Sequence, residues 1–194
     1  LEIIPTPHTK PEIVSFLMEY GEQFLGKTTV LAKDTPAFIA NRVGVYGIMA
    51  LLHLVEKLDL SVEEVDKLTG PVLGRPKSAT FRTGDVVGLD TLVNVAKGLK
   101  DNCPNDEANG LFTLPEYLKK MVENKWFGDK TGQGFYKKVK GKDGKSEILV
   151  LDLKTLEYKP QQKVKFATLE MTKPIDNLKE RVKVLVSGKD KAGE

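Results

Sequence analysis

The side chain best placed to do chemistry is Asn41, in the run K-D-T-P-A-F-I-A-N-R at 33–42. Its amide offers two hydrogen-bond donors and an acceptor, which suits a polar contact in a cleft. The run is typical of a helix start, with Asp34 or Thr35 as N-cap and Pro36 at the first helical position. We therefore expect a helix over about 36–58, with Asn41 one turn in. The alternative is a structural amide that bonds to a neighbouring loop.

The histidines and the cysteine have settings that point away from catalysis. His8 lies in P-T-P-H-T, a loop composition, and His53 lies on the apolar helix over 36–58, where an interior or interface histidine is the ordinary expectation. Cys103 lies in the loop-like run D-N-C-P-N-D. A single cysteine excludes an internal disulfide and fits a reducing compartment. Without metal-type clusters around it, we expect no metal site.

A dinucleotide site would need a Gly-rich turn of the G-x-G-x-x-G type between a strand and a helix, because backbone amides must approach the pyrophosphate closely. The sequence contains no such run; Gly132-Gln-Gly134 matches only part of it and is followed by aromatic residues and a lysine pair. We expect a turn there. Trp126, Phe135 and Tyr136 are interpreted as side chains that fill the core. We therefore expect no cofactor site on this chain.

Composition limits the remaining classes of function. The chain has 194 residues, 40% of them hydrophobic, and a net charge of +3. It can bury a core, and its interspersed charges, also in the lysine-rich tail, do not favour nucleic acid. The absence of a transmembrane-length apolar run or a signal peptide favours a cytoplasmic location. The sequence opens on L-E-I-I-P, which resembles the end of a buried strand, so we expect a piece of a longer protein.

Hydrophobic periodicity predicts a mainly α chain with a small β appendage. The expected helices cover 11–26, 36–58, 61–70 with a capping box at its start, 81–99, 114–125 and 174–186. The expected strands cover 28–32, 147–153 and 157–159, with a turn at 141–145 between strand-like segments and a hairpin between the last two strands. The helix over 36–58 is apolar almost all round, so we expect it to be buried in a bundle or between subunits.

Three runs match one known family in order and spacing: L-E-I-I-P-T at 1–6, the run at 33–42, and G-D-K-T-G-Q-G-F-Y at 128–136. The run G-R-P-K-S-A-T-F-R-T-G-D-V-V-G-L-D-T at 74–91 adds support. Together they resemble the C-terminal domain of L-3-hydroxyacyl-CoA dehydrogenases, NAD-dependent enzymes of fatty-acid β-oxidation, and most closely the long bacterial and archaeal forms. The resemblance implies a helical domain of the 6-phosphogluconate-dehydrogenase-like type over 1–138. Residues 139–194 would then be a β-hairpin and a linker toward a following domain.

The resemblance also implies roles for individual residues. In the family a histidine removes the 3-hydroxyl proton of the substrate, and a glutamate orients that histidine. Glu2 matches the glutamate, whereas the histidine would lie upstream of Leu1. Asn41 matches an asparagine that faces the substrate between two domains. Arg42 and Arg75 could reach the CoA phosphates or form structural ion pairs.

The implied activity is oxidation of a (3S)-3-hydroxyacyl-CoA to a 3-oxoacyl-CoA. The implied partners are an acyl-CoA, a second copy of the chain, and an N-terminal Rossmann domain that binds NAD. We expect the isolated chain to be inactive, because neither the base nor the cofactor site lies in it. Two alternatives remain: a non-catalytic helical dimerisation or interaction module, and a 3-hydroxybutyryl-CoA dehydrogenase-type relative.

Overall fold

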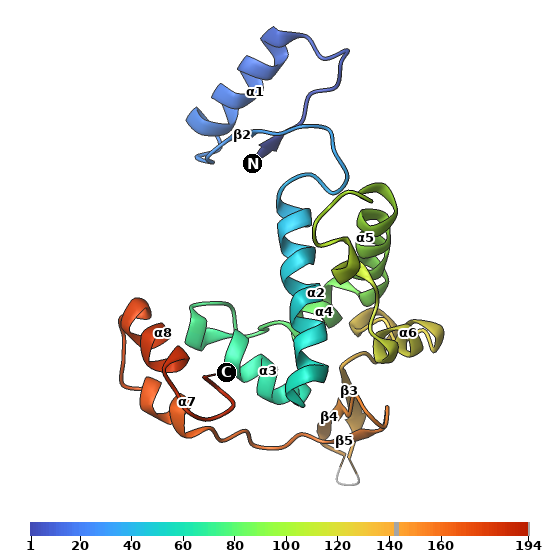
Figure 1. Ribbon diagram of the computed structural model, residues 1–194, viewed down its shortest axis with the longest axis vertical. Coiled ribbons are helices and arrows are strands. Elements are labelled where there is room, and N and C mark those ends of the chain that lie inside the picture. The colour runs from blue at the N-terminus through green and yellow to red at the C-terminus, as the bar shows by residue number, and fades with distance from the viewer. Residues whose placement is uncertain (142–143, 194) are drawn as a thin grey trace. The chain divides into compact units, whose positions relative to one another are not determined.

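The computed structural model describes residues 1–141 and 144–193 and is mainly helical, as the sequence predicted (Figure 1). Contacts divide the chain into two units, residues 1–47 with 95–113 and residues 48–94 with 114–194. The predicted turn at 141–145 lies partly outside the described residues, because these exclude 142–143.

The first unit opens with a parallel β-α-β arrangement. Strand β1 (Glu2–Ile3) pairs with strand β2 (Val30–Leu31), and helix α1 (Pro11–Gln23) connects them. Proline fits the start of α1 because the first amide of a helix needs no acceptor. Strand β2 is therefore shorter than the strand predicted over 28–32. Helix α1 ends three residues before Gly26, where the sequence predicted its end.

Helix α2 (Ala40–Leu58) begins four residues later than the sequence predicted. Ala37 and Phe38 adopt φ angles of 61° and 53°, so the chain turns in the left-handed region just where the helix was expected. The predicted N-cap at Asp34 or Thr35, with Pro36 at the first helical position, is therefore wrong. Helix α2 receives its cap from another part of the chain, described below.

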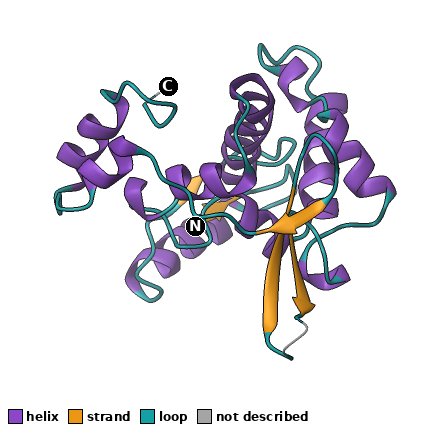
Figure 2. Cartoon of the chain, turned by 90° about the horizontal axis from the view of Figure 1, so that it is seen from below, coloured by secondary structure: helices purple, strands orange, loops and turns teal. Residues whose placement is uncertain are grey.

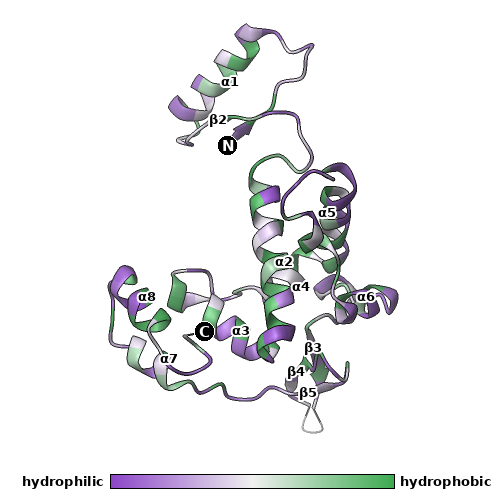
Figure 3. Cartoon of the chain, in the orientation of Figure 1, coloured by the Kyte–Doolittle hydropathy of each residue, from purple (hydrophilic) through white to green (hydrophobic). Residues whose placement is uncertain are grey.

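Helix α2 is buried along one stripe, not all round. The residues of the buried stripe are Val45, Met49, Leu52 and Val55. An opposite apolar stripe is exposed: Val43 is 67% exposed, Tyr46 48% and Leu54 45%. Apolar residues follow α2 along most of its length (Figure 3). The helix thus presents apolar surface that the described residues leave uncovered.

The helices of the second unit follow the predicted pattern with one break. Helix α3 (Val62–Thr69) starts with the predicted capping box, in which Ser61 and Glu64 bond to each other's backbone amides, and the short helix η1 (Pro71–Leu73) follows. The predicted helix over 81–99 is divided into α4 (Phe81–Val87) and α5 (Leu89–Asn102). Gly88 separates them with a φ of 98°, which interrupts the helical hydrogen-bond ladder and suits glycine. Helix α6 (Glu116–Glu123) confirms the next prediction.

Three antiparallel strands form the β appendage (Figure 2). Strand β4 (Ser146–Leu151) lies between β3 (Tyr136–Lys140) and β5 (Tyr158–Pro160). The predicted hairpin is confirmed as the β4–β5 pair, with Leu151 opposite Tyr158. Strand β3 confirms the strand-like segment expected before the turn at 141–145. It directly follows the turn at 128–135 and so ties the sheet to that turn.

The C-terminal segment folds back onto the second unit. It contains α7 (Ala167–Thr172), which was not anticipated, and α8 (Leu178–Val186), which was. From α8, the Arg181 guanidinium donates to the carbonyl oxygens of Val72 at 2.9 Å and Pro71 at 3.4 Å. Backbone carbonyls at the end of η1 thereby gain a charged donor, which anchors the tail.

Candidate functional site

The Glu2 carboxylate caps the start of helix α2. One carboxylate oxygen accepts a hydrogen bond from the backbone N–H of Ile39 at 2.8 Å, and the other accepts from Ala40 at 2.9 Å. The first amides of a helix have no acceptor within it, and the helix dipole favours a negative charge there. Glu2, which lies 37 residues before Ile39, therefore caps the helix in place of Asp34 or Thr35, the caps that the sequence analysis expected.

These contacts keep Glu2 ionised. The amides of Ile39 and Ala40 stabilise the charged form and lower the pKa of Glu2. Each carboxylate oxygen has two lone pairs, and each uses one on a backbone amide, so Glu2 can still accept a further N–H. Its position and charge therefore suit a residue that holds a cationic or donating partner, such as an imidazole.

Asn41 directly follows Ala40, whose amide Glu2 binds. It is the second residue of α2 and is exposed, and no hydrogen bond to its amide occurs within 1–141 and 144–193. The alternative of an amide satisfied by a neighbouring loop thus has no support. The structure brings together Glu2 and Asn41, the two site residues that the sequence predicted, through the start of one helix.

Arg42 forms a structural ion pair. Its guanidinium contacts the carboxylate of Asp106, whose side chain is only 9% exposed, and Asp106 also accepts from the Ala108 amide at 2.8 Å. Of the two alternatives for Arg42, the ion pair is confirmed. Arg75 is exposed and forms no ion pair within the described parts of the chain. Cys103 is half-buried, in the loop after α5.

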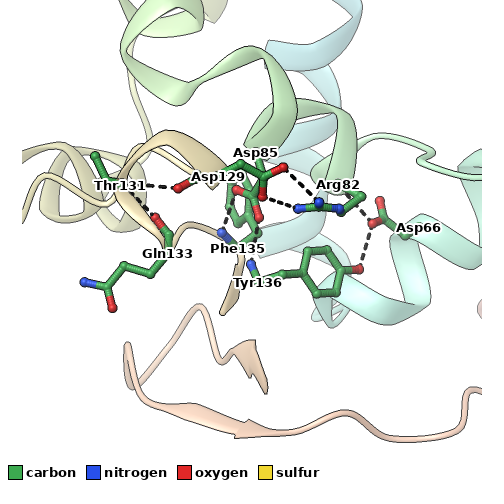
Figure 4. A network of polar contacts seen from close by, with 9 residues as sticks. Asp66, Arg82, Asp85, Asp129, Thr131, Gln133, Phe135 and Tyr136 are labelled. Carbon is green, nitrogen blue, oxygen red and sulfur yellow. Dashed lines mark hydrogen bonds and ion pairs between the residues drawn. The ribbon is translucent and has the colours of Figure 1, made fainter. Parts of the chain in front are cut away.

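The run at 128–136 is built around the buried Asp85, which is 1% exposed. Its two oxygens accept from the backbone amides of Phe135 and Tyr136, both at 2.8 Å (Figure 4). A Cβ at Gly134 would lie 2.1 Å from Asp85 Oδ1, and a Cβ at Gly128 would lie 2.2 Å from the Asp85 carbonyl oxygen. Both glycines are therefore required by close approach to Asp85.

A second carboxylate, Asp66, caps helix α4. It accepts from the backbone amides of Thr80 at 3.1 Å, Phe81 at 2.7 Å and Arg82 at 3.1 Å, and the Tyr136 hydroxyl donates to it at 2.7 Å (Figure 4). Despite these bonds, burial raises the pKa of Asp66. Asp66 thus joins α3, α4 and β3.

The same network is completed by an ion pair and an aromatic contact. Arg82 donates to both oxygens of Asp129 at 2.6 and 2.8 Å. Phe135 is 1% exposed and its ring lies 4.3 Å from that of Phe81, which confirms the interpretation of Phe135 as a core residue. The run at 128–136 is therefore structural support, and sequence reasoning missed both Asp66 and Asp85. No local signal marks either acid, since their partners lie 14 to 70 residues away.

The turn at Gly132 and Gly134 does not fit the pyrophosphate of NAD. Gly132 and Gly134 belong to a turn that leads into β3, not to a strand–helix junction. Gly134 moreover packs against the Asp85 carboxylate, which would repel a phosphate. Within the same residues, no group of three histidine, cysteine or acidic side chains could hold a metal ion. No helix among them is long and apolar enough to cross a membrane.

Residues 38–138 match the model of the 3-hydroxyacyl-CoA dehydrogenase C-terminal domain. Over 193 residues the chain is 47% identical to a probable 3-hydroxyacyl-CoA dehydrogenase of Bacillus subtilis, covering 100% of this chain and 24% of that protein. Over 140 residues it is 51% identical to a probable 3-hydroxyacyl-CoA dehydrogenase of Deinococcus radiodurans, covering 72% of this chain and 40% of that protein.

A solved structure agrees with these matches. The crystal structure of FadB2 from M. tuberculosis has a TM-score of 0.59 and 31% sequence identity, covering 70% of this chain and 46% of that chain. The chain spans less than half the length of these relatives. With the matching family model covering more than half of it, the chain belongs to the 3-hydroxyacyl-CoA dehydrogenase C-terminal domain family.

Proposed function

We propose that this chain is the substrate-side portion of an NAD-dependent (3S)-3-hydroxyacyl-CoA dehydrogenase of fatty-acid β-oxidation, which forms 3-oxoacyl-CoA. The observation that carries the proposal is the bond from the Ala40 amide to Glu2, which places Asn41 one residue from the carboxylate. Asn41 would contact the acyl-CoA through its free amide. The membership of the chain in the family supports this assignment.

Glu2 would act as a positioning residue for a histidine base outside this chain. Its ionised carboxylate would accept the imidazole N–H, fix the tautomer and stabilise the imidazolium that forms when the substrate hydroxyl loses its proton. The amides of Ile39 and Ala40 support this role in two ways: they lower the pKa of Glu2, and they fix its orientation.

NAD would be held by a Rossmann domain outside this chain. The β1-α1-β2 unit supports this proposal, because strands of two residues do not form a stable sheet alone. Its apolar side chains are also exposed: Phe16 by 59%, Phe24 by 76% and Leu31 by 56%. A larger parallel sheet with its helices would cover these residues.

The division at residue 138, the cytoplasmic location and the linker role of 139–194 stay predictions.

The chain would pair with a second copy through the exposed stripe of α2. Val43, Tyr46 and Leu54 lie on one helical face and form an apolar surface of the kind that protein interfaces cover. Sedimentation velocity tests this: we expect a concentration-dependent dimer that Tyr46→Lys weakens. A monomer at every concentration would contradict the proposal.

The dehydrogenase assignment can be tested in the full-length protein by following NADH during reduction of a 3-oxoacyl-CoA. Glu2→Gln should lower kcat on the order of a hundredfold, the range for loss of acid–base catalysis, with little change in KM. Asn41→Ala should mainly raise KM, since it removes a substrate contact. In this direction the histidine donates a proton, so its pKa sets the alkaline limb of the kcat/KM pH profile. That limb should move to lower pH in Glu2→Gln, because the imidazolium loses a stabilising charge.

Glu12→Gln is the matched control, since Glu12 is exposed in the first turn of α1. It should behave as the unchanged protein does. Near-normal turnover of Glu2→Gln, or an unaltered pH profile, would refute its role beside the base. NADH turnover by the 194-residue chain alone would refute the proposal that base and cofactor site lie outside it.

A further inference from the structure

The second unit contains a cavity of about 720 Å³ that involves neither Glu2 nor Asn41. Helix α3 provides Lys67 and Asp66, α4 provides Arg82, and strand β3 provides Tyr136. The full lining is Glu63, Asp66, Lys67, Pro71, Lys77, Arg82, Asp129, Gly132, Tyr136, Lys137, Lys138, Ile148, Gln161, Gln162 and Val164. Its volume falls in the range of about 300–1,000 Å³ that is typical of small-molecule sites.

The acids of this lining are already engaged. Asp129 is paired with Arg82, and Asp66 accepts three backbone amides and the Tyr136 hydroxyl. Glu63 accepts the backbone amide of Gln162 at 3.2 Å. Among the described residues these contacts use both oxygens of Asp66 and Asp129, whereas only one oxygen of Glu63 accepts a bond.

Four lysines of the lining have no acidic partner within the described residues: Lys67, Lys77, Lys137 and Lys138. By contrast, Lys130 and Lys159 of the same unit contact Asp90 and Asp152. The Lys137 ammonium lies 5.2 Å from the centroid of the Tyr158 ring, which does not line the cavity, so it is directed to the opposite face of β3 from Tyr136 and Lys138. The cavity therefore has an excess of positive charge, which favours an anionic ligand.

The remaining walls are suited to an organic group beside that anion. Ile148, Val164 and Pro71 are apolar, and Gln161 offers an amide. Gln161 and Val164 come from the extended segment after β5, beyond residue 138 where the family match ends. The bond from Gln162 to Glu63 anchors this segment at the cavity. The cavity is thus completed by a part of the chain that the family domain does not include.

We propose that this cavity binds an organic diphosphate, with the phosphates at Lys67, Lys77 and Lys138 and the organic group against the apolar walls. Ammonium groups bind phosphate oxygens through charge-assisted hydrogen bonds. Adenine nucleotides and coenzyme A share this chemistry. The proposal does not depend on the dehydrogenase assignment, since it concerns binding alone.

Isothermal titration of the 194-residue chain with ADP, coenzyme A and inorganic pyrophosphate tests the site. We expect saturable binding of ADP that weakens with added salt. The double variant Lys67→Ser with Lys77→Ser should weaken it by about tenfold or more, as expected for loss of charge-assisted contacts. If coenzyme A binds as tightly as ADP and loses binding in the same variant, the site also accepts the nucleotide end of coenzyme A. If only ADP binds, the ligands of the site are free nucleotides.

The matched control is Lys120→Ser with Lys125→Ser, two exposed lysines of the same unit that remove the same charge and do not line the cavity. It should change the dissociation constant less than about twofold, because exposed charges that do not contact the ligand are screened by salt. Equal losses in the two double variants would overturn the site in favour of general charge attraction. No binding of ADP at millimolar concentration, or pyrophosphate binding as tightly as ADP, would overturn an organic diphosphate site.

Discussion

The buried Asp85 should make the stability of the second unit depend on pH. Burial raises the pKa of this carboxyl from 3.8 to about 6, despite the amides of Phe135 and Tyr136 that bond to it. The folded chain therefore holds the Asp85 proton more tightly than the unfolded chain. The resulting stabilisation is present below about pH 4 and is lost as the pH rises through about 6.

The size of this effect follows from the two pKa values. One pKa unit corresponds to about 1.4 kcal/mol, so the ionised form of Asp85 costs the folded state about 3 kcal/mol in total. About 2 kcal/mol of this falls between pH 4.5 and pH 7.5. Acids with a lowered pKa, such as Glu2 and Asp152, act in the opposite direction but mainly at lower pH.

Urea unfolding followed by the fluorescence of the single Trp126 would measure this dependence. The Trp126 ring lies 5.6 Å from that of Tyr158, whose hydroxyl donates to the Gly134 carbonyl at 2.6 Å. The reporter is thus linked through Tyr158 to the turn that packs on Asp85. The free energy of unfolding of the unchanged protein relative to Asp85→Asn should fall by about 2 kcal/mol between pH 4.5 and pH 7.5.

Glu123→Gln serves as the control, since Glu123 is exposed at the end of α6 and should leave the pH dependence unchanged. A constant difference between the unchanged protein and Asp85→Asn over this pH range would refute the reasoning. It would mean that the two amides compensate fully for the burial of the charge.

Four substitutions should change the free energy of unfolding, as measured by the same urea titration. Gly134→Ala should cost more than about 3 kcal/mol, because a Cβ would lie 2.1 Å from Asp85 Oδ1. Gly132→Ala should cost only about 1–2 kcal/mol, because its Cβ would meet no atom and the cost comes from the φ of 77° alone. Equal costs for the two substitutions would contradict the close-approach argument. Tyr136→Phe should cost about 2 kcal/mol, because it removes a hydrogen bond to a carboxylate, and a neutral effect would mean that this bond contributes nothing. Ser61→Ala should cost about 1 kcal/mol by removing the capping box, and an unchanged midpoint would show that the box is dispensable.

Local sequence signals predicted most of the helices. The capping box at Ser61 and the apolar periodicity of α2, α6 and α8 each depend on residues within a turn or two, and the structure contains all four features. The hairpin between β4 and β5 was predicted by the same kind of local pattern. Asn41 and Glu2 were singled out by their sequence frames, and their roles in catalysis stay predictions.

The start of α2 shows where local signals failed. Asp34, Thr35 and Pro36 form a standard helix start, yet the chain turns at Ala37 and Phe38 and the helix begins at Ala40. A cap that comes from 37 residues upstream competes with the local one, and its stabilisation exists only once β1 lies beside the helix start.

The sequence by itself determined that the chain is mainly helical and which family it resembles, and it predicted two polar residues for the site. Only the tertiary structure decided how the site is held. Glu2, Asp66 and Asp85 each accept backbone amides from distant parts of the chain. A carboxylate can satisfy the free amides of any segment that folding brings within about 3 Å of it, and sequence spacing carries no record of that distance.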